Sequence, residues 1–295
     1  MKVAVTGATG WVGRAVVDLA VSQGHSVVSI DRAHDPTGSN ASRFIQLELG
    51  DYAALQSALS GCDALIHLAA INGPGREPDH VVHNNNVVSS YHALRAAAEV
   101  DIRRVCQASS VNAIGGRFSR WPRYDYLPVD EQHPSYAEDP YSLSKWICEK
   151  QADAIALRYP DMSIASLRLH GVVADRTDTA GWLDTPHQIA EKQLWGYTLR
   201  DAAARAFLLG VTTDIDAHEV FYIVAPETMV DTPSLELKTE HYPEVPVRGD
   251  LSATRGFFDC NKAAEVLGWN HDVVEPTTTD PTPLPETAQP PGPSQ

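Results

Sequence analysis

The chain has 295 residues, of which 43% are hydrophobic and 21% are charged, as expected for a globular protein with one large domain or one domain and a small appendage. Its formal net charge of −15 repels phosphate groups and argues against nucleic acid and anionic membranes as partners. The sequence contains no apolar run of about 18 residues, so no membrane span is predicted. The first residues enter a strand directly, so we expect no secretory signal. The four cysteines are scattered along the chain, which favours reduced thiols over a metal site. We therefore expect a cytoplasmic protein that binds small molecules and no metal.

The first half of the sequence alternates short apolar runs with amphipathic stretches. These predict strands at Lys2–Thr6, Ser26–Ile30, Ala64–Leu68 and Arg103–Ala108, and helices at Val12–Gln23, Tyr52–Leu59 and Val87–Val100. The alternation predicts a parallel sheet with helices on both faces, and right-handed crossovers make it a doubly wound α/β fold of the Rossmann type. Three asparagines, residues 84–86, precede the third helix, and N-capping explains at least one of them.

The second half begins with a long loop, Gly116–Pro134, which is rich in arginine, proline and aromatic residues, and loops of this length are often functional. Asp139 as N-cap and Pro140 in the first turn then open a helix that runs to about Arg158. The remaining elements are a strand at Ser163–Leu169, an irregular segment at Ala174–Leu194, a helix near Asp201–Leu209, a strand near Val220–Val224, and two short helices at Thr232–His241 and Asn261–Leu267.

These elements divide the chain into a cofactor-binding Rossmann domain and a small C-terminal substrate-binding region. Residues 1–175 form the Rossmann domain, with residues 197–226 returning to its sheet. Residues 176–196 and 227–274 form the smaller region. The Thr- and Pro-rich tail, residues 275–295, has the composition of a disordered segment.

A glycine-rich loop joins the first strand to the first helix. Gly7, Gly10 and Gly13 follow the spacing G-x-x-G-x-x-G, with Trp11 and Val12 between the last two. Glycines there permit a tight turn, close approach of a pyrophosphate to the backbone and close packing of helix on strand. The free N–H groups of the first helical turn then face the anion, so the loop predicts a dinucleotide site.

An acidic residue, Asp31, ends the second strand, eighteen residues after Gly13. A carboxylate at this position accepts hydrogen bonds from the adenosine ribose hydroxyls and repels a 2′-phosphate, which favours NAD. Arg32 follows directly and is able to hold a 2′-phosphate, so NADP stays open.

Three residues are candidates for catalysis. Tyr141 and Lys145 are four apart and share one face of the helix that Asp139 opens. We expect Lys145, the oxidised nicotinamide and the helix N-terminus to lower the tyrosine pKa from its usual value of about 10. Ser110 lies at the carboxyl edge of the fourth predicted strand, where parallel sheets bind ligands, and it can hold the reacting oxygen.

Together these motifs resemble the extended short-chain dehydrogenases/reductases, the NAD-dependent epimerase/dehydratase family, over roughly residues 1–270. The resemblance implies Ser110, Tyr141 and Lys145 as catalytic residues, the latter two also touching the cofactor. It implies further cofactor contacts at Asp51 and Tyr52 (adenine), Leu68, Ala69 and Ala70 (pyrophosphate and ribose) and His170 (nicotinamide).

Substrate contacts are expected where segments leave the strand ends. The candidates are Asn72, Ser110, Asn112 and Gly171, with Arg117, His170 and Trp182 on neighbouring segments. An arginine or histidine there is able to bind a carboxylate or hydroxyl groups. A solvated loop position is the alternative for each.

The sequence departs from the family pattern in ways that bear on the substrate. Ala113 and Ile114 replace the Val-Tyr of the serine motif, Gly171 replaces an asparagine that often touches a nucleotide sugar, and the chain is short for a nucleotide-sugar epimerase. Uronate dehydrogenases of the same family share the Ile-Gly ending of the motif.

We therefore expect hydride transfer at a secondary alcohol or ketone, sugar-derived and of the kind that a uronate dehydrogenase carries out. A sugar or nucleotide-sugar epimerase or dehydratase with tightly bound cofactor is the first alternative. A non-catalytic NAD(P)-binding regulator is the second. The helix from Tyr141 carries an apolar face of Trp146, Ile147, Ala154 and Leu157, which predicts a homodimer because such helices often dimerise in this family.

Overall fold

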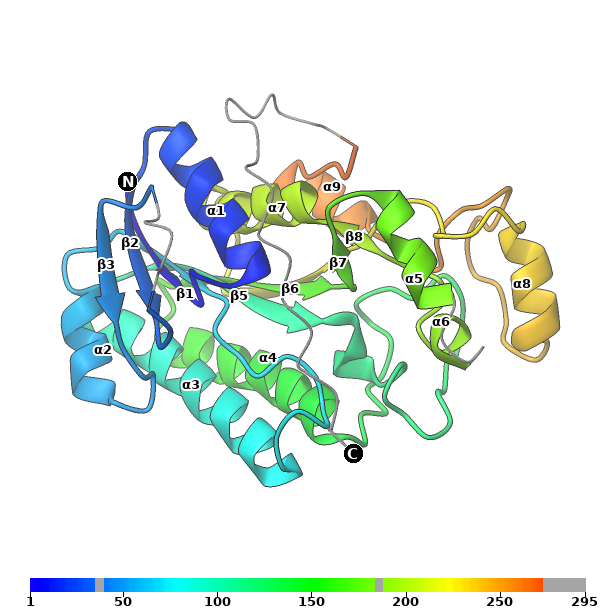
Figure 1. The fold of residues 1–295 in the computed structure, drawn as a ribbon, viewed down its shortest axis with the longest axis horizontal. Helices are drawn as coiled ribbons and strands as arrows, with labels where there is room; N and C mark the ends of the chain where they lie inside the picture. Colours follow the sequence, from blue (N-terminus) through cyan, green and yellow to red (C-terminus); the bar gives the residue numbers. More distant parts are fainter. Residues whose placement is uncertain (35–39, 184–187, 273–295) are drawn as a thin grey trace, which may run out of the picture.

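A computed structural model describes residues 1–34, 40–183 and 188–272. Within these residues the largest sheet is parallel and has seven strands in the order β3-β2-β1-β4-β5-β6-β9 (Figure 1). The strands are β1 (Lys2–Thr6), β2 (Ser26–Asp31), β3 (Arg43–Gln46), β4 (Ala64–His67), β5 (Arg104–Ser110), β6 (Ser163–Leu169) and β9 (His218–Ile223). The strand order reverses between β1 and β4, which is where doubly wound sheets bind their ligands.

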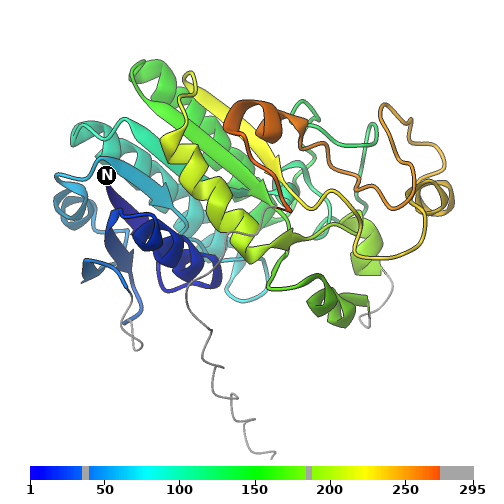
Figure 2. The same ribbon diagram turned by 90° about the horizontal axis from the view of Figure 1, so that it is seen from above.

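Helices cover both faces of this sheet. One layer consists of α2 (Tyr52–Leu59), α3 (Asp79–Glu99) and α4 (Pro140–Arg158), and the other of α1 (Trp11–Ser22), α7 (Arg200–Thr212) and α9 (Asn261–Leu267). Figure 2 shows α1, α7 and α9 side by side on the near face of the sheet. Buried Val16 and Phe207 pack on one side, and Leu94 and Ile155 on the other, so each face has its own apolar core. The predicted doubly wound Rossmann fold is confirmed.

A smaller set of elements lies beyond the ends of β5, β6 and β9. It contains the 3-10 helices η1 (Val111–Ile114) and η2 (Arg176–Thr179), the helices α5 (Ala180–Leu183), α6 (Gln188–Lys192) and α8 (Ser234–His241), and the paired strands β7 (Val172–Val173) and β8 (Thr198–Leu199). A third apolar cluster, which includes Leu127, Trp195, Tyr222 and Phe257, holds these elements on the sheet. The longest axis of the molecule runs from β3 and α2 at one end to α8 at the other (Figure 1).

A buried ion pair fastens α4 to the sheet. Arg168 on β6 donates to both carboxylate oxygens of Glu149, at 2.9 and 2.8 Å, and to the Tyr222 hydroxyl at 3.1 Å. The Ser109 hydroxyl on β5 donates to the same carboxylate at 2.5 Å. Two charges removed from water are tolerated only when paired and hydrogen-bonded, as they are here, so the position of α4 over β5 and β6 is fixed.

The structure corrects the predicted secondary structure in three places. The third helix begins at Asp79 rather than Val87, so asparagines 84–86 lie inside it and Pro78 is the N-cap residue. The edge strand β3 and the short strands β7 and β8 were not predicted. The segment Ala174–Leu194, expected to be irregular, contains η2, α5 and α6.

The predicted tail, residues 275–295, lies outside the described residues. Among the residues that are described, no helix combines the length and apolar character needed to cross a bilayer. The four cysteines are free thiols.

Candidate active site

The β1–α1 loop is so tightly folded that two of its positions accept only glycine. Gly7 has φ +70°, and a Cβ there would lie 2.7 Å from the backbone nitrogen of Ala69. A Cβ on Gly13 would lie 2.1 Å from the carbonyl oxygen of Gly7. The loop thus presents bare backbone and packs directly on the segment after β4, as a pyrophosphate cradle requires.

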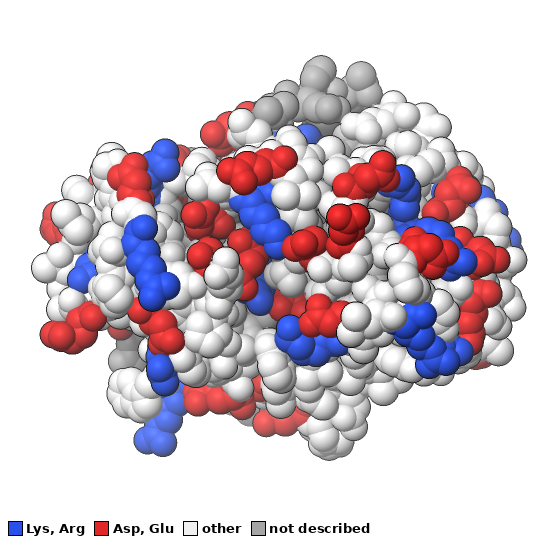
Figure 3. Space-filling model, turned by 180° about the vertical axis from the view of Figure 1, so that it is seen from behind, with Lys and Arg blue, Asp and Glu red and all other residues white. Residues whose placement is uncertain are grey.

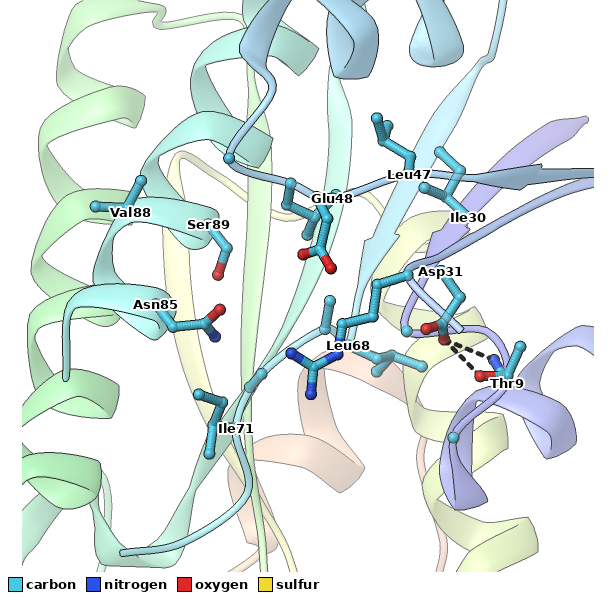
Figure 4. A pocket seen from close by; sticks show the side chains of 17 residues that line it. Thr9, Ile30, Asp31, Leu47, Glu48, Leu68, Ile71, Asn85, Val88 and Ser89 are labelled. Carbon is cyan, nitrogen blue, oxygen red and sulfur yellow. Dashed lines mark hydrogen bonds between the residues drawn. The ribbon is translucent and has the colours of Figure 1, made fainter. Parts of the chain in front are cut away.

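Beside this loop is a cavity of about 320 Å³. Its walls come from four segments of the Rossmann sheet and include the predicted cofactor residues Gly7, Gly10, Asp31, Arg32, Leu68, Ala69 and Ala70. Asn85 and Ser89 on α3 point into it from the side opposite Thr9 and Asp31 (Figure 4). The cavity lies at the point where the strand order reverses, so its place and its lining fit the adenosine side of a dinucleotide.

Asp31 is fixed at the rim of this cavity. One of its carboxylate oxygens accepts from the backbone nitrogen of Thr9 at 3.0 Å and from the Thr9 hydroxyl at 2.8 Å (Figure 4). The other accepts from the nitrogen of Ala33 at 3.1 Å. An anchored carboxylate with lone pairs to spare fits ribose hydroxyls and disfavours a 2′-phosphate.

Eight residues that the sequence assigned to the cofactor do not line the cavity; three of them, Tyr141, Lys145 and His170, belong to the catalytic side described below. Asp51 caps α2, accepting from the nitrogen of Ala54 at 3.0 Å, and its neighbour Gly50 forms the wall instead. The Tyr52 hydroxyl donates to Glu99 on α3. Trp11 is exposed, and the Arg200 guanidinium lies 4.5 Å from the centre of its ring. Val12 packs on the core, and Gly13 is buried at the start of α1.

The structure brings Ser110, Tyr141 and Lys145 together at the end of β5. The Asp139 carboxylate caps α4, accepting from the nitrogens of Tyr141 at 3.0 Å and Ser142 at 2.9 Å, and so places Tyr141 in the first turn. The Ser110 hydroxyl lies close enough to the Tyr141 hydroxyl to lower the pKa of the phenol. The Lys145 ammonium donates to the carbonyl of Ala108 at 2.7 Å and lies 5.8 Å from the centre of the Tyr141 ring.

The acidity of Tyr141 differs from the expectation. Burial, and to a smaller extent the negative charge of Asp139, raise the pKa of its phenol to about 12, while the neighbouring Ser110 hydroxyl acts in the opposite direction. Lys145 does not offset the burial, because its ammonium is turned to the Ala108 carbonyl, and burial lowers its own pKa. The helix N-terminus, expected to make the phenol more acidic, carries an acidic cap that acts in the opposite direction. Tyr141 is therefore a neutral phenol near pH 7.

Asn86 is a positioning residue that sequence reasoning missed. Its side chain is buried on α3, where its amide oxygen accepts from the nitrogen of Ile71 at 2.8 Å. Its amide nitrogen donates to the carbonyl of Ile71 and to the Ser144 hydroxyl, both at 3.1 Å. Asn86 thus ties the cavity wall after β4 to the helix that carries Lys145. The available signal was a run of poor helix formers, which we attributed to capping.

On the nicotinamide side, His170 and Gly171 form a packed wall. Nε2 of the buried His170 ring hydrogen-bonds the carbonyl of Gln193 at 2.9 Å, and Nδ1 accepts from the nitrogen of Gly171 at 2.7 Å. Burial lowers the pKa of His170 to about 4, so the ring is neutral. A Cβ on Gly171 would lie 2.6 Å from Trp182, which covers it. Both ring nitrogens of His170 are already used, and its backbone nitrogen donates to the Thr198 hydroxyl at 3.1 Å, so none of these nitrogens is free for a ligand.

Of the predicted substrate residues, Asn112 lies closest to the catalytic hydroxyls. Its backbone nitrogen and its amide nitrogen donate to the Ser110 oxygen at 3.1 and 3.3 Å. Its amide oxygen accepts from the backbone nitrogen of Arg117 at 3.1 Å. Asn72 is exposed after β4. Asn112 therefore orients the Ser110 hydroxyl and fixes the start of the loop that follows η1.

Residues 3–197 match the NAD dependent epimerase/dehydratase family. The chain is 28% identical over 184 residues to dTDP-6-deoxy-L-talose 4-dehydrogenase (NAD(+)) from Aggregatibacter actinomycetemcomitans, a match that covers 59% of this chain and 63% of that protein. It is 25% identical to UDP-glucose 4-epimerase from Mycolicibacterium smegmatis over 93% of this chain and 95% of that protein.

Among solved structures, a short-chain dehydrogenase/reductase superfamily protein from Agrobacterium tumefaciens with bound NAD superposes with a TM-score of 0.71 at 21% identity, over 93% of each chain. This likeness supports the fold. The family match extends over well more than half of the chain, and it confirms the family resemblance and the expected class of NAD-dependent enzymes. The chain belongs to the NAD dependent epimerase/dehydratase family, whose cofactor is NAD.

Proposed function

We propose that the protein is an NAD-dependent dehydrogenase that interconverts a secondary alcohol and its ketone on a sugar-derived substrate. The observation that carries this proposal is the grouping of the Ser110 and Tyr141 hydroxyls with the Lys145 ammonium at the end of β5, next to a cavity whose lining fits the adenosine side of a dinucleotide. Asp31 supports NAD over NADP, since its anchored carboxylate repels a 2′-phosphate.

The three side chains divide the work of proton transfer. The nicotinamide of bound NAD supplies the carbon that gives or accepts the hydride. In the reducing direction the Tyr141 phenol gives its proton to the carbonyl oxygen as hydride reaches the carbonyl carbon, so a ketone becomes an alcohol and a tyrosinate remains. Ser110 donates a hydrogen bond to the same oxygen, and the Lys145 ammonium would stabilise the tyrosinate on turning from the Ala108 carbonyl toward the phenol. The oxidising direction reverses each transfer.

The test is Tyr141→Phe, which keeps the ring and removes the transferable proton. A positioned acid contributes typically 10²–10⁴-fold, so turnover should fall by about that factor while the affinity for NAD stays within about twofold. Turnover is followed at the absorbance band of reduced nicotinamide, and NAD binding by calorimetry. Tyr91→Phe, which alters a half-exposed tyrosine on α3, is the matched control. Near-normal turnover of Tyr141→Phe refutes the assignment.

An epimerase or dehydratase is the second candidate, supported by the alignment with a UDP-glucose 4-epimerase over 93% of this chain. In that case cofactor remains bound and is regenerated in each cycle. The purified protein would then release NAD only on denaturation, and turnover would proceed without net change at the reduced-nicotinamide band. A purely regulatory role needs no proton donor, and the assembled Ser110, Tyr141 and Lys145 argue against it.

We also propose a homodimer that forms through α3 and α4. These two helices pack along each other and leave apolar side chains uncovered, with Val81 on α3 and Trp146 and Leu157 on α4. Exposed fractions of 37% for Trp146 and 84% for Leu157 are high for such side chains, and a second copy is the simplest cover for them.

The division of labour and the setting of the protein are proposals as well. Residues 1–175 with 197–226 would bind cofactor, and residues 176–196 and 227–274 would bind substrate, which the position of the cavity supports. On the face shown in Figure 3, acidic and basic side chains are interspersed, which supports a small-molecule partner over nucleic acid. Three of the four free thiols are buried, which suits a reducing cytoplasm.

A further inference from the structure

The loop after η1 places an arginine next to the catalytic hydroxyls. The backbone nitrogen of Arg117 donates to Asn112 at 3.1 Å, and Asn112 in turn donates to the Ser110 oxygen at 3.3 Å. The Arg117 guanidinium lies 5.4 Å from the centre of the Phe118 ring, and that ring meets the Tyr141 ring edge-on at 5.8 Å. Two short chains of contacts therefore connect Arg117 to the residues that would hold the reacting oxygen.

The charge of Arg117 has no counter-ion among the described residues. Partial burial lowers the pKa of its guanidinium, and no carboxylate acts against this effect. By contrast, Arg123 in the same loop pairs with Asp125 at 2.9 Å. The guanidinium lies close enough to His170 for its charge to lower the pKa of that imidazole. Arg117 is an exposed residue, so its guanidinium can be reached by a ligand, and its packing against the Phe118 ring leaves the charge unneutralised.

The positive charge of the Arg117 loop contrasts with the negative charge of the rest of the chain. The chain as a whole carries −15, yet residues 117–123 hold three arginines. A substrate with a negative charge would be repelled by the protein at large and needs a cation at the point of binding. The planar fork of an arginine suits the two oxygens of a carboxylate or phosphate.

The loop that carries Arg117 is held in place by α6. The Lys192 ammonium donates to the carbonyls of Ser119 at 3.0 Å and Arg120 at 3.2 Å. The Tyr124 hydroxyl donates to the carbonyl of Lys192 at 2.7 Å. A binding residue on a fastened loop loses little entropy on meeting its ligand.

We propose that Arg117 binds an acidic oxygen group of the substrate, a carboxylate or a phosphate, and so sets a preference for anionic sugar-derived substrates. This inference rests on the proposed dehydrogenase function for the identity of the site. Asn112 holds the backbone of Arg117 and orients the Ser110 hydroxyl, so the arginine side chain starts from a fixed point near the reacting oxygen.

The test measures binding apart from turnover. Protein saturated with NAD is titrated by calorimetry with D-glucuronate, D-glucose 6-phosphate, UDP-glucose and neutral D-glucose. At least one acidic probe should bind about tenfold or more tightly than glucose, and Arg117→Gln should weaken that probe by roughly 10–100-fold, the usual range for a hydrogen bond to a charged group. The binding of glucose should not change. The probe that responds tells carboxylate from phosphate.

Two further variants sharpen the result. Arg117→Lys keeps the charge without the fork and should retain part of the preference, while Arg120→Gln removes the same charge three residues away and should change binding less than about threefold. Equal binding of all four probes, or an acidic probe that Arg117→Gln leaves unaffected, overturns the proposal. Arg117-dependent binding without hydride transfer in assays of all probes would instead count against the dehydrogenase function and leave the binding role standing.

Discussion

Gly13 shows how strictly one residue of the cofactor loop is determined. Its added Cβ would lie 2.1 Å from the Gly7 carbonyl oxygen and 2.9 Å from the Ala8 Cα, both backbone atoms that cannot rotate away. Gly13→Ala should therefore displace the loop, lower stability by about 1–3 kcal/mol and abolish NAD binding. Thermal unfolding with and without NAD measures both effects.

Gly181→Ala is the matched control for this substitution. Gly181 is an exposed glycine of α5 with nothing within 4 Å of an added Cβ. Because alanine favours the helix over glycine, the change should be neutral or stabilise by up to about 1 kcal/mol. A Gly13→Ala protein that binds NAD normally would contradict the cradle described for the loop.

The identities of the catalytic residues could be predicted from the sequence, but their electrostatic surroundings could not. Ser110, Tyr141 and Lys145 were recognisable because their motif and its place after a strand are properties of the chain itself. The acidity of Tyr141 was predicted in the wrong direction, since it depends on burial and on where the Lys145 ammonium points. That Arg117 lacks a counter-ion within residues 1–34, 40–183 and 188–272 likewise becomes known only once distant segments are assembled.

At the scale of elements, a chain of hydrogen bonds joins α4 to two strands. The Asp153 carboxylate meets Nδ1 of His218 at 2.6 Å, and Nε2 of that ring meets the Ser166 hydroxyl at 2.7 Å. The sequence of carboxylate, imidazole and hydroxyl is the same as in the Asp-His-Ser catalytic triad of hydrolases. However, Ser166 is fully buried in the sheet and its oxygen also accepts from Gln107 at 2.8 Å, so the chain holds elements together and offers no nucleophile.

This hydrogen-bond chain predicts a definite dependence of stability on pH. The bond to His218 is the largest cause that lowers the pKa of Asp153, from 3.8 to about 2. A carboxyl group with a lower pKa in the folded state stabilises the fold above the unfolded value of 3.8, and this contribution is lost as the pH falls through about 2.

The measurement is the free energy of unfolding by urea between pH 7 and pH 2.5. The wild-type protein should lose stability below pH 4 more steeply than Asp153→Asn, which has no carboxylate to protonate. Asp101→Asn is the control, because Asp101 is an exposed carboxylate, its side chain 86% exposed, at a backbone position that asparagine also tolerates. Parallel curves for wild type and Asp153→Asn would exclude the effect.

Elements were predictable where local signals decide them. The start of α4 follows from Asp139 and Pro140, which act on the backbone next to them. The start of α3 did not, because Asp79 begins a polar stretch whose Asn86 is satisfied by Ile71 and Ser144 from other segments. The edge strand β3 has four residues and pairs with β2 alone, too short for a periodic pattern.

At the scale of the whole molecule, the uncovered apolar side chains of α3 and α4 lead to a prediction about assembly. A buried tryptophan at an interface often contributes 2 kcal/mol or more, so Trp146→Glu should weaken the dimer by roughly 30-fold or more. Light scattering coupled to size-exclusion chromatography at micromolar concentration measures the mass. Leu235→Glu, at a leucine on α8 that is 58% exposed, should leave the mass of the dimer unchanged. A wild-type protein that runs as a monomer at these concentrations refutes the interface.

The attachment of Lys192 bears on how substrate binding and chemistry would be coupled in this protein. Its ammonium, on α6, holds the loop at Ser119 and Arg120, and the preceding residue, Phe118, places its ring 5.8 Å from the Tyr141 ring. A disturbance of α6 should therefore reach both the proposed substrate arginine and the proposed proton donor. Substitutions in α6 that alter which substrate is accepted would then alter the rate of the reaction as well.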